Sequence, residues 1–166
     1  MIGRWQHLIL GTALSLVLVL ATAALSHRPA WQSLPEDHAL IRLSFTASGV
    51  RNCRDRSAEE LAALPRNMRQ TQICDRRRAP VYVELDIDGE TVFSGELPPS
   101  GLSGSGPSRI YQRFELPAGS YEIALRLRDD PALAGFTSSA SRRVTLSPAQ
   151  SIAIDYNAEK GGFVFH

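Results

Sequence analysis

The feature that most constrains this chain is an apolar segment near its N-terminus. Residues 8–25 are all apolar or small, and this length is near the lower limit for a helix that crosses the hydrocarbon core of a membrane. Arg4 precedes the segment and Arg28 follows it. The rest of the sequence is polar by comparison and patterned for strands. The sequence therefore predicts one membrane-grade helix followed by a domain outside the membrane.

Two features favour an uncleaved anchor over a cleaved signal peptide. The small residues at 21–23 (Ala-Thr-Ala) offer a cleavage site, but the apolar run continues beyond them to Leu25. Trp5 and Trp31 bracket the run, and the helical rise between them is about 39 Å, close to the separation of the two membrane interfaces that tryptophan prefers. We therefore expect residues 1–29 to form a single-pass anchor with its N-terminus inside. Signal cleavage and a buried core helix remain alternatives.

Apolar and polar residues alternate along much of the remaining chain. In residues 41–46 the odd-numbered side chains are apolar and the even-numbered ones polar, the pattern of a half-buried strand. Residues 81–87 alternate in the same way. Asp88-Gly89 then supplies the turn signal of a tight hairpin.

Several more short strands are expected, with turns and no helix–strand alternation between them. They lie at residues 91–97, 109–116, 121–127, 142–146, 151–156 and 162–165. Seven or eight such strands predict an all-β fold, an antiparallel β-sandwich. The chain beyond the anchor is long enough for one domain, so we expect a linker at residues 30–38 and a single domain at 39–166.

Two strand-turn-strand segments carry a resemblance to a known family. Residues 114–125 (FELPAGSYEIAL) and 143–154 (RVTLSPAQSIAI) resemble the corresponding signatures of PEGA-like and carboxypeptidase-regulatory-like domains. The resemblance implies a small transthyretin- or immunoglobulin-like sandwich outside the cytoplasmic membrane, usually without catalytic activity. Gln150 follows Ala149 where that family more often has glycine, and the resemblance assigns no functional residues.

An insertion at residues 51–78 interrupts the strand pattern and carries both cysteines. Outside the cytoplasm an even pair is most simply a disulfide, so we expect Cys53 to pair with Cys74. Ser57 and Glu60 fit the capping box of a short helix between them. Met68 also lies between the cysteines, so a soft metal site of two thiolates and a thioether is the alternative. A disulfide places the domain in the periplasm and the anchor in the cytoplasmic (inner) membrane.

Charge is distributed unevenly around this insertion. Residues 51–78 hold eight arginines and four acidic residues, whereas residues 79–100 hold five acidic residues and no basic one. The two segments are expected to neutralise each other on one surface; the alternative is a basic face for lipid headgroups or an acidic partner. The net charge of the chain is only +1, and no aromatic residues interleave with Arg76 to Arg78, so we expect no nucleic-acid binding.

The sequence matches none of the common motifs for catalysis or cofactor binding. The loop at residues 98–107 fails the nucleophile-elbow and phosphate-loop patterns, and the turn after Asp86 fails the spacing of an EF-hand calcium site. A nucleophilic serine also needs a neighbouring base. We therefore expect no enzymatic activity and no cofactor. The 98–107 loop is instead a candidate for docking, because Leu102 is apolar in a polar stretch and loops often carry binding.

The sequence predicts a non-enzymatic accessory or assembly subunit that docks, from the periplasmic side, on a larger membrane protein complex. Tethering favours such a role because it raises the effective concentration toward other membrane proteins. The alternative function is a metal or haem chaperone for maturation of a respiratory or copper enzyme, using Cys53, Met68 and Cys74; a small-molecule ligand is left open. The predicted docking residues are Arg54, Arg56, Arg66, Arg69, Arg76, Arg77, Arg78 and Leu102.

Overall fold

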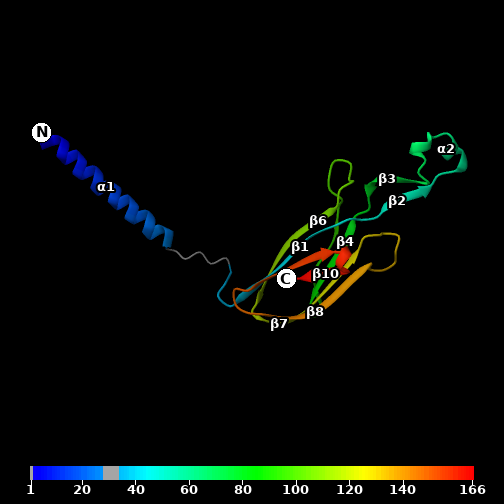
Figure 1. Ribbon diagram of the computed structural model, residues 1–166. Helices are drawn as coiled ribbons and strands as arrows, with labels where there is room; N and C mark the ends of the chain where they lie inside the picture. The colour runs from blue at the N-terminus through cyan, green and yellow to red at the C-terminus, as the bar shows by residue number, and fades with distance from the viewer. Residues whose placement is uncertain (1, 28–33) are drawn as a thin grey trace. The chain divides into compact units, whose positions relative to one another are not determined.

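The computed structural model describes residues 2–27 and 34–166, which fall into two compact units, Met1–Pro35 and Glu36–His166. The first unit holds one helix, α1 (Ile2–His27) (Figure 1). Its segment Trp5–Ser26 has a mean hydropathy of 2.5 and is long and apolar enough to cross a membrane, and its side chains are exposed. This exposure suits an anchor or a signal sequence and not a core helix. Arg28 and Trp31, on which part of the anchor prediction rests, lie outside the described residues.

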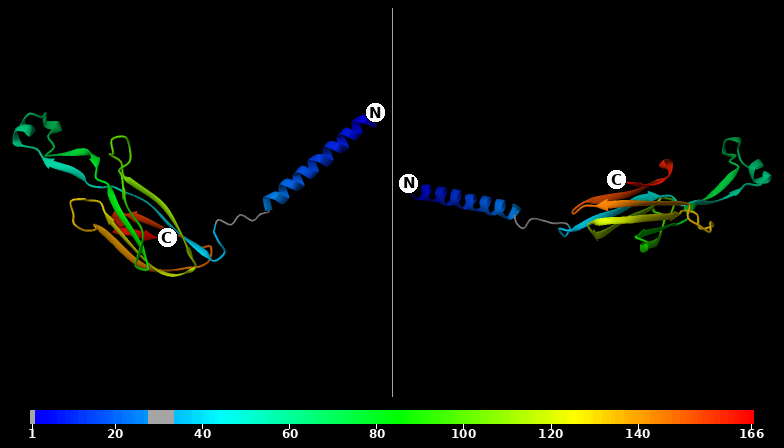
Figure 2. Two further views of the ribbon diagram at one scale, coloured as in Figure 1. Left: turned by 180° about the vertical axis from the view of Figure 1, so that it is seen from behind. Right: turned by 90° about the horizontal axis from the view of Figure 1, so that it is seen from below.

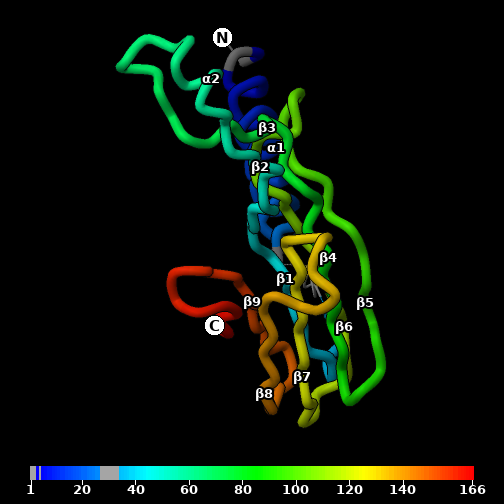
Figure 3. The backbone as a smooth tube through the Cα atoms, turned by 90° about the vertical axis from the view of Figure 1, so that its right-hand side faces the viewer, coloured from blue at the N-terminus to red at the C-terminus, as the bar shows by residue number. Residues whose placement is uncertain are grey.

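The second unit is a sandwich of two four-stranded sheets, which confirms the predicted fold class (Figures 1 and 3). One sheet has the order β10-β9-β1-β6 and the other the order β5-β4-β7-β8. The first comprises β1 (His38–Ala47), β6 (Ser108–Pro117), β9 (Ser151–Asn157) and β10 (Gly162–Phe165). The second comprises β4 (Val81–Ile87), β5 (Glu90–Leu97), β7 (Gly119–Arg128) and β8 (Ser138–Leu146).

One strand pair departs from the expected antiparallel arrangement. β9 runs parallel to β1, with Ile41 opposite Ile152 and Leu43 opposite Ile154. The reason is that β8 belongs to the opposite sheet, so the chain between β8 and β9 crosses from one layer to the other and does not form a hairpin within a sheet. The remaining neighbouring pairs in the two sheets are antiparallel.

The core lies between the sheets and follows the predicted alternation. Ile41 and Leu43 of β1 are fully buried while Arg42 between them is exposed. Both sheets contribute side chains that are wholly removed from solvent. These are Ala39, Ile41, Leu43, Val81, Val83, Leu85, Ile123, Leu125, Leu127 and Ile154. The predicted turn between β4 and β5 is also confirmed, because Asp88 and Gly89 have φ values of 50° and 82°, as a two-residue hairpin with the right-handed strand twist requires.

The insertion forms an arm, defined here as residues 51–78, that projects beyond the sandwich (Figures 1 and 2). It comprises β2 (Arg51–Asp55), the short helix α2 (Ala58–Ala62), a 3₁₀ turn η1 (Arg66–Met68) and β3 (Gln72–Arg78). β2 and β3 pair with each other as a separate two-stranded ribbon. No arm residue is buried, and the whole arm lies in the described part of the chain. The chain enters the sandwich at His38, the first residue of the ten-residue strand β1, and the arm leaves the sandwich near the other end of this strand.

Candidate functional site

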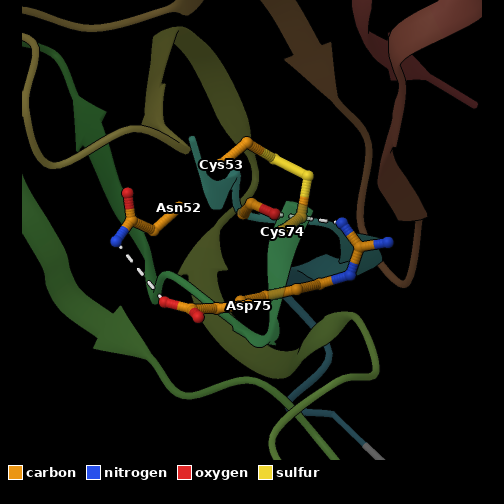
Figure 4. Close-up of a disulfide and its surroundings, with 6 residues drawn as sticks. Asn52, Cys53, Cys74 and Asp75 are labelled. Atoms are coloured by element: carbon orange, nitrogen blue, oxygen red, sulfur yellow. Dashed lines mark hydrogen bonds between the residues drawn. A yellow bond between two sulfur atoms is a disulfide. The ribbon is translucent and has the colours of Figure 1, made fainter. Parts of the chain in front are cut away.

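The predicted disulfide is present and staples the arm ribbon (Figure 4). Cys53 and Cys74 face each other across the β2–β3 ladder with their Cα atoms 4.0 Å apart. Beside them Asn52 Nδ2 donates a hydrogen bond to Asp75 Oδ2 at 3.4 Å. Both sulfurs are bonded to each other, so neither cysteine offers a free thiolate. A metal site that used them with Met68 would first require reduction of the bridge.

The tip of the arm is ordered by its own polar side chains. The predicted capping box is confirmed: the Ser57 hydroxyl accepts from the Glu60 N–H at 3.2 Å, and the Glu60 carboxylate accepts from the Ser57 N–H at 3.0 Å. The same carboxylate forms a two-pronged ion pair with Arg54, with N–O distances of 2.8 and 3.0 Å. The Arg54 guanidinium and then the Ser57 N–H lower the pKa of Glu60 to about 2. Arg69 Nε donates to the Leu64 carbonyl at 2.9 Å, so Arg54 and Arg69 both shape the arm.

Arg78 joins the base of the arm to the loop at residues 98–107. It is half-buried, and its Nη1 donates to the Gly49 carbonyl while its Nε donates to the Ser105 carbonyl, each at 3.1 Å. Its backbone N–H donates to the Gly104 carbonyl at 2.9 Å. Among the predicted docking residues Arg78 therefore acts as a positioning residue between two surface elements.

The loop at residues 98–107, called the Leu102 loop below, is closed by its own backbone. The Ser100 N–H donates to the Pro107 carbonyl at 3.2 Å, and the Gly106 N–H donates to the Ser100 carbonyl at 2.9 Å. A Cβ atom on Gly106 would lie 2.4 Å from Ser100 Oγ and 2.9 Å from the Ser100 carbonyl oxygen, and because the carbonyl belongs to the backbone, this turn requires glycine. At the tip Leu102 has a relative exposure of 113%. The predicted irregular loop is thus a hydrogen-bonded structure that holds one leucine fully in solvent.

Five arginines of the arm remain. Arg56, a predicted docking residue, is half-buried, and its Nε atom has no hydrogen-bond partner among the described residues. The other four are exposed and free of local partners. Within the described residues no side-chain hydrogen bond or ion pair involves Arg51, Arg66, Arg76 or Arg77, and all four are exposed. Their charge is therefore available to an external group.

We expected the acidic residues of the segment 79–100 to neutralise the arginines of the arm. This prediction is wrong for two of its carboxylates. Glu84 and Asp86 pair instead with Arg126 of the neighbouring strand β7, at 2.9 Å for Glu84. This pairing arises because Glu84 faces Arg126 directly across the β4–β7 ladder. Sequence alone gave no sign of it, since the two residues are far apart in the chain.

Sequence reasoning also missed how the base of the arm is built. The Val50 N–H donates to the Asp129 carbonyl at 3.1 Å, and the Ala79 N–H donates to the Val50 carbonyl at 2.8 Å. A Cβ atom on Gly49 would lie only 2.0 Å from the Ala79 carbonyl oxygen, so the two ends of the arm meet at a glycine. These bonds bring the loop that follows β7 against Arg51, which the sequence did not single out.

The described residues contain no cluster of three or more histidine, cysteine, aspartate or glutamate side chains that could hold a metal ion. A hollow beside the β4–β5 turn is lined by Asp86, Asp88 and Glu122, but Arg143 shares it. The end of the sandwich that carries the arm and the Leu102 loop combines unpaired arginines with a fully exposed apolar side chain.

Comparison with known proteins finds no matching family model, no matching curated protein and no matching solved structure. The resemblance of residues 114–125 and 143–154 to PEGA-like and carboxypeptidase-regulatory-like domains therefore stays a prediction.

Proposed function

We propose that this chain is a non-enzymatic accessory or assembly subunit that docks on a larger membrane protein complex on the periplasmic side of the cytoplasmic membrane. The observation that carries the proposal is the pairing of two features at one end of the sandwich. Leu102 is held fully in solvent by an internally bonded loop, and next to it stands an arm whose arginines have spare charge.

Leu102 supplies the apolar anchor of the proposed interface. Burying a fully exposed leucine contributes about 1.5–3 kcal/mol, and interfaces concentrate their energy in a few such side chains surrounded by a polar rim. The loop bonds fix the leucine before binding, so little conformational entropy is lost on docking. Arg66 and Arg76 of the arm supply the basic part of the rim, and rim charges accelerate encounter with an acidic surface.

The tether supports the same role. Trp5–Ser26 is apolar enough to anchor the chain, and the Cys53–Cys74 bridge suits an oxidising compartment outside the cytoplasm. An anchored domain searches for partners in the thin layer next to the membrane, which raises its effective concentration there. A weak docking surface of one leucine and a few arginines is then sufficient for stable association.

The test is purification of the tagged full-length protein from its native membranes in mild detergent, followed by mass spectrometry of the stoichiometric partners. We expect Leu102→Ser to remove the partner, and Arg76→Gln to weaken its recovery more at low salt than at high salt, because salt screens the charge that the arginine supplies. Arg78 is left unchanged, because its loss would disturb the Leu102 loop itself.

Two matched substitutions control for general effects of lost apolar surface and lost charge. Val92→Ser alters an exposed apolar residue on β5, and Arg109→Gln alters an exposed arginine on β6. Both variants are expected to retain the partner. Loss of the partner from the controls, or its full retention by Leu102→Ser, would contradict the proposal.

A further inference from the structure

A recess of about 680 Å³ opens at the base of the arm, between its two strands and the loop that follows β7. One wall comes from Arg51, Cys53 and Arg77 of the arm, and the opposite wall from residues 130–132. It is called the arm-base recess below. Its lining mixes guanidinium groups with the apolar surfaces of the cysteine side chain and of Pro131.

The three arginines and two aspartates that line the arm-base recess give it a net charge of +1. Three arginines line it, and only Arg78 is engaged, by the carbonyls of Gly49 and Ser105. The two carboxylates that also line it already accept hydrogen bonds: Asp75 from Asn52, and Asp130 from the Ala132 N–H at 2.9 Å. Arg51 and Arg77 are therefore open to an anion.

Folding alone gives no reason for this arrangement of like charges. Arg51 lies directly opposite Arg78 in the β2–β3 ladder, and like charges in that position destabilise a strand pair. The ribbon tolerates the repulsion because the Cys53–Cys74 bridge and the carbonyls around Arg78 hold it closed. An anion bound beside Arg51 would offset this repulsion.

The recess is fixed in shape before any ligand arrives. Val50 and Ala79 are bonded to the neighbouring backbone at the floor of the arm. The stem of Arg77 packs along the Leu102 loop, where a Cβ atom on Gly104 would lie 3.2 Å from Arg77 Cγ. Arg77 thus faces both the recess and the loop, so the two form one continuous surface.

We propose that the arm-base recess receives an acidic segment of the partner protein, whose carboxylates are bound by Arg51 and Arg77. A guanidinium binds a carboxylate through two parallel hydrogen bonds, and the recess has room for a side chain and a short piece of backbone. This inference rests on the proposed docking function and names the chemistry of the partner. The partner carries an acidic segment that enters the recess and, beside it, an apolar pocket that receives Leu102.

The neighbouring carboxylates favour a protein segment over a lipid surface. Asp75 and Asp130 line the recess, and Asp129 precedes it in the chain. These carboxylates repel any anion, but a flexible acidic segment can place its carboxylates beside Arg51 and Arg77 and away from the aspartates, whereas a flat layer of anionic headgroups cannot. The recess therefore favours an acidic segment over an extended negative surface.

The test uses the full-length protein in nanodiscs of neutral phosphatidylcholine and a fluorescein-labelled hexaglutamate peptide as the probe. Fluorescence anisotropy at low salt measures the Kd. We expect the native protein to bind hexaglutamate but not hexaglutamine, and the Arg51→Gln/Arg77→Gln variant to bind at least tenfold more weakly. Arg109→Gln/Arg113→Gln removes the same charge from the outer face of β6 and is expected to bind as the native protein does. Asp130→Asn, which keeps the acceptor for Ala132, is expected to bind severalfold more tightly.

Three outcomes would overturn the inference. The first is failure of the native protein to bind hexaglutamate. The second is an equal loss of affinity in the two double-arginine variants, which would indicate net charge alone. The third is binding to vesicles containing phosphatidylglycerol that depends on Arg51 and Arg77, without binding of the peptide, which would assign the recess to lipid. If Leu102→Ser loses the native partner while Arg51→Gln/Arg77→Gln retains it, the recess assignment fails and the docking function stands.

Discussion

Removal of the Cys53–Cys74 bridge is expected to unfold the arm and leave the sandwich intact. The bridge closes a loop with a sequence separation of 21, for which the chain-entropy model gives a stabilisation of about 3 kcal/mol. None of the arm's residues is buried, so the arm has no hydrophobic core to make up this loss. Every 1.4 kcal/mol is a factor of ten, and the open form of the arm should therefore become about a hundredfold more populated.

Hydrogen exchange on the Cys53→Ser/Cys74→Ser variant measures this directly. The Arg56 N–H donates to the Thr71 carbonyl across the arm at 2.8 Å. Its protection against hydrogen exchange should fall about a hundredfold. Amides of Leu85 and Leu125 in the fully buried centre of the sandwich should exchange as in the native protein. Unchanged protection of Arg56 would show that the bridge is not the staple, and an equal loss at Leu125 would show that arm and sandwich unfold together.

Three further perturbations test the fold. Gly49→Ala forces a Cβ atom toward the Ala79 carbonyl oxygen and should destabilise the domain by about 1–3 kcal/mol or more; a denaturation curve identical to that of the native protein would contradict the close approach. Leu125→Ala leaves a cavity at a wholly buried site and should lower the free energy of unfolding by about 2–5 kcal/mol, as measured by the same denaturation curve. The pKa of Glu60 is lowered to about 2, from an ordinary value near 4.5. The ion pair of Glu60 with Arg54 should therefore stabilise the arm fully above pH 4.5, and this contribution should be lost as the pH falls toward 2. An NMR titration of the Glu60 carboxyl near 4.5 would contradict its pairing with Arg54.

Elements whose structure is decided by nearby residues were predictable from the sequence. The alternation in residues 81–87, followed by Asp88-Gly89, places strand β4 and its turn correctly, because a half-buried strand and a two-residue turn each have a local signature. The capping box of Ser57 and Glu60 is equally local. The disulfide followed from the count of cysteines and from the compartment that the apolar helix implies.

Features that depend on contacts across the fold were not predictable. The parallel pairing of β1 with β9 depends on which layer each strand joins, which alternation does not encode. Arg126 was given no role, although it neutralises Glu84. The arm-base recess joins Arg51 and Arg77 of the arm to Asp130, which follows strand β7 much later in the chain, so only the folded backbone brings them together.

The central claim is that the domain docks through the end that carries the arm and the Leu102 loop. The most direct test is photo-crosslinking in native membranes, with the reactive amino acid placed at Leu102 or, as a control, at Tyr111, an exposed residue of β6. The account predicts one discrete adduct from position 102, weakened by Arg76→Gln, and none from position 111. An adduct from position 111 with none from position 102 would contradict it.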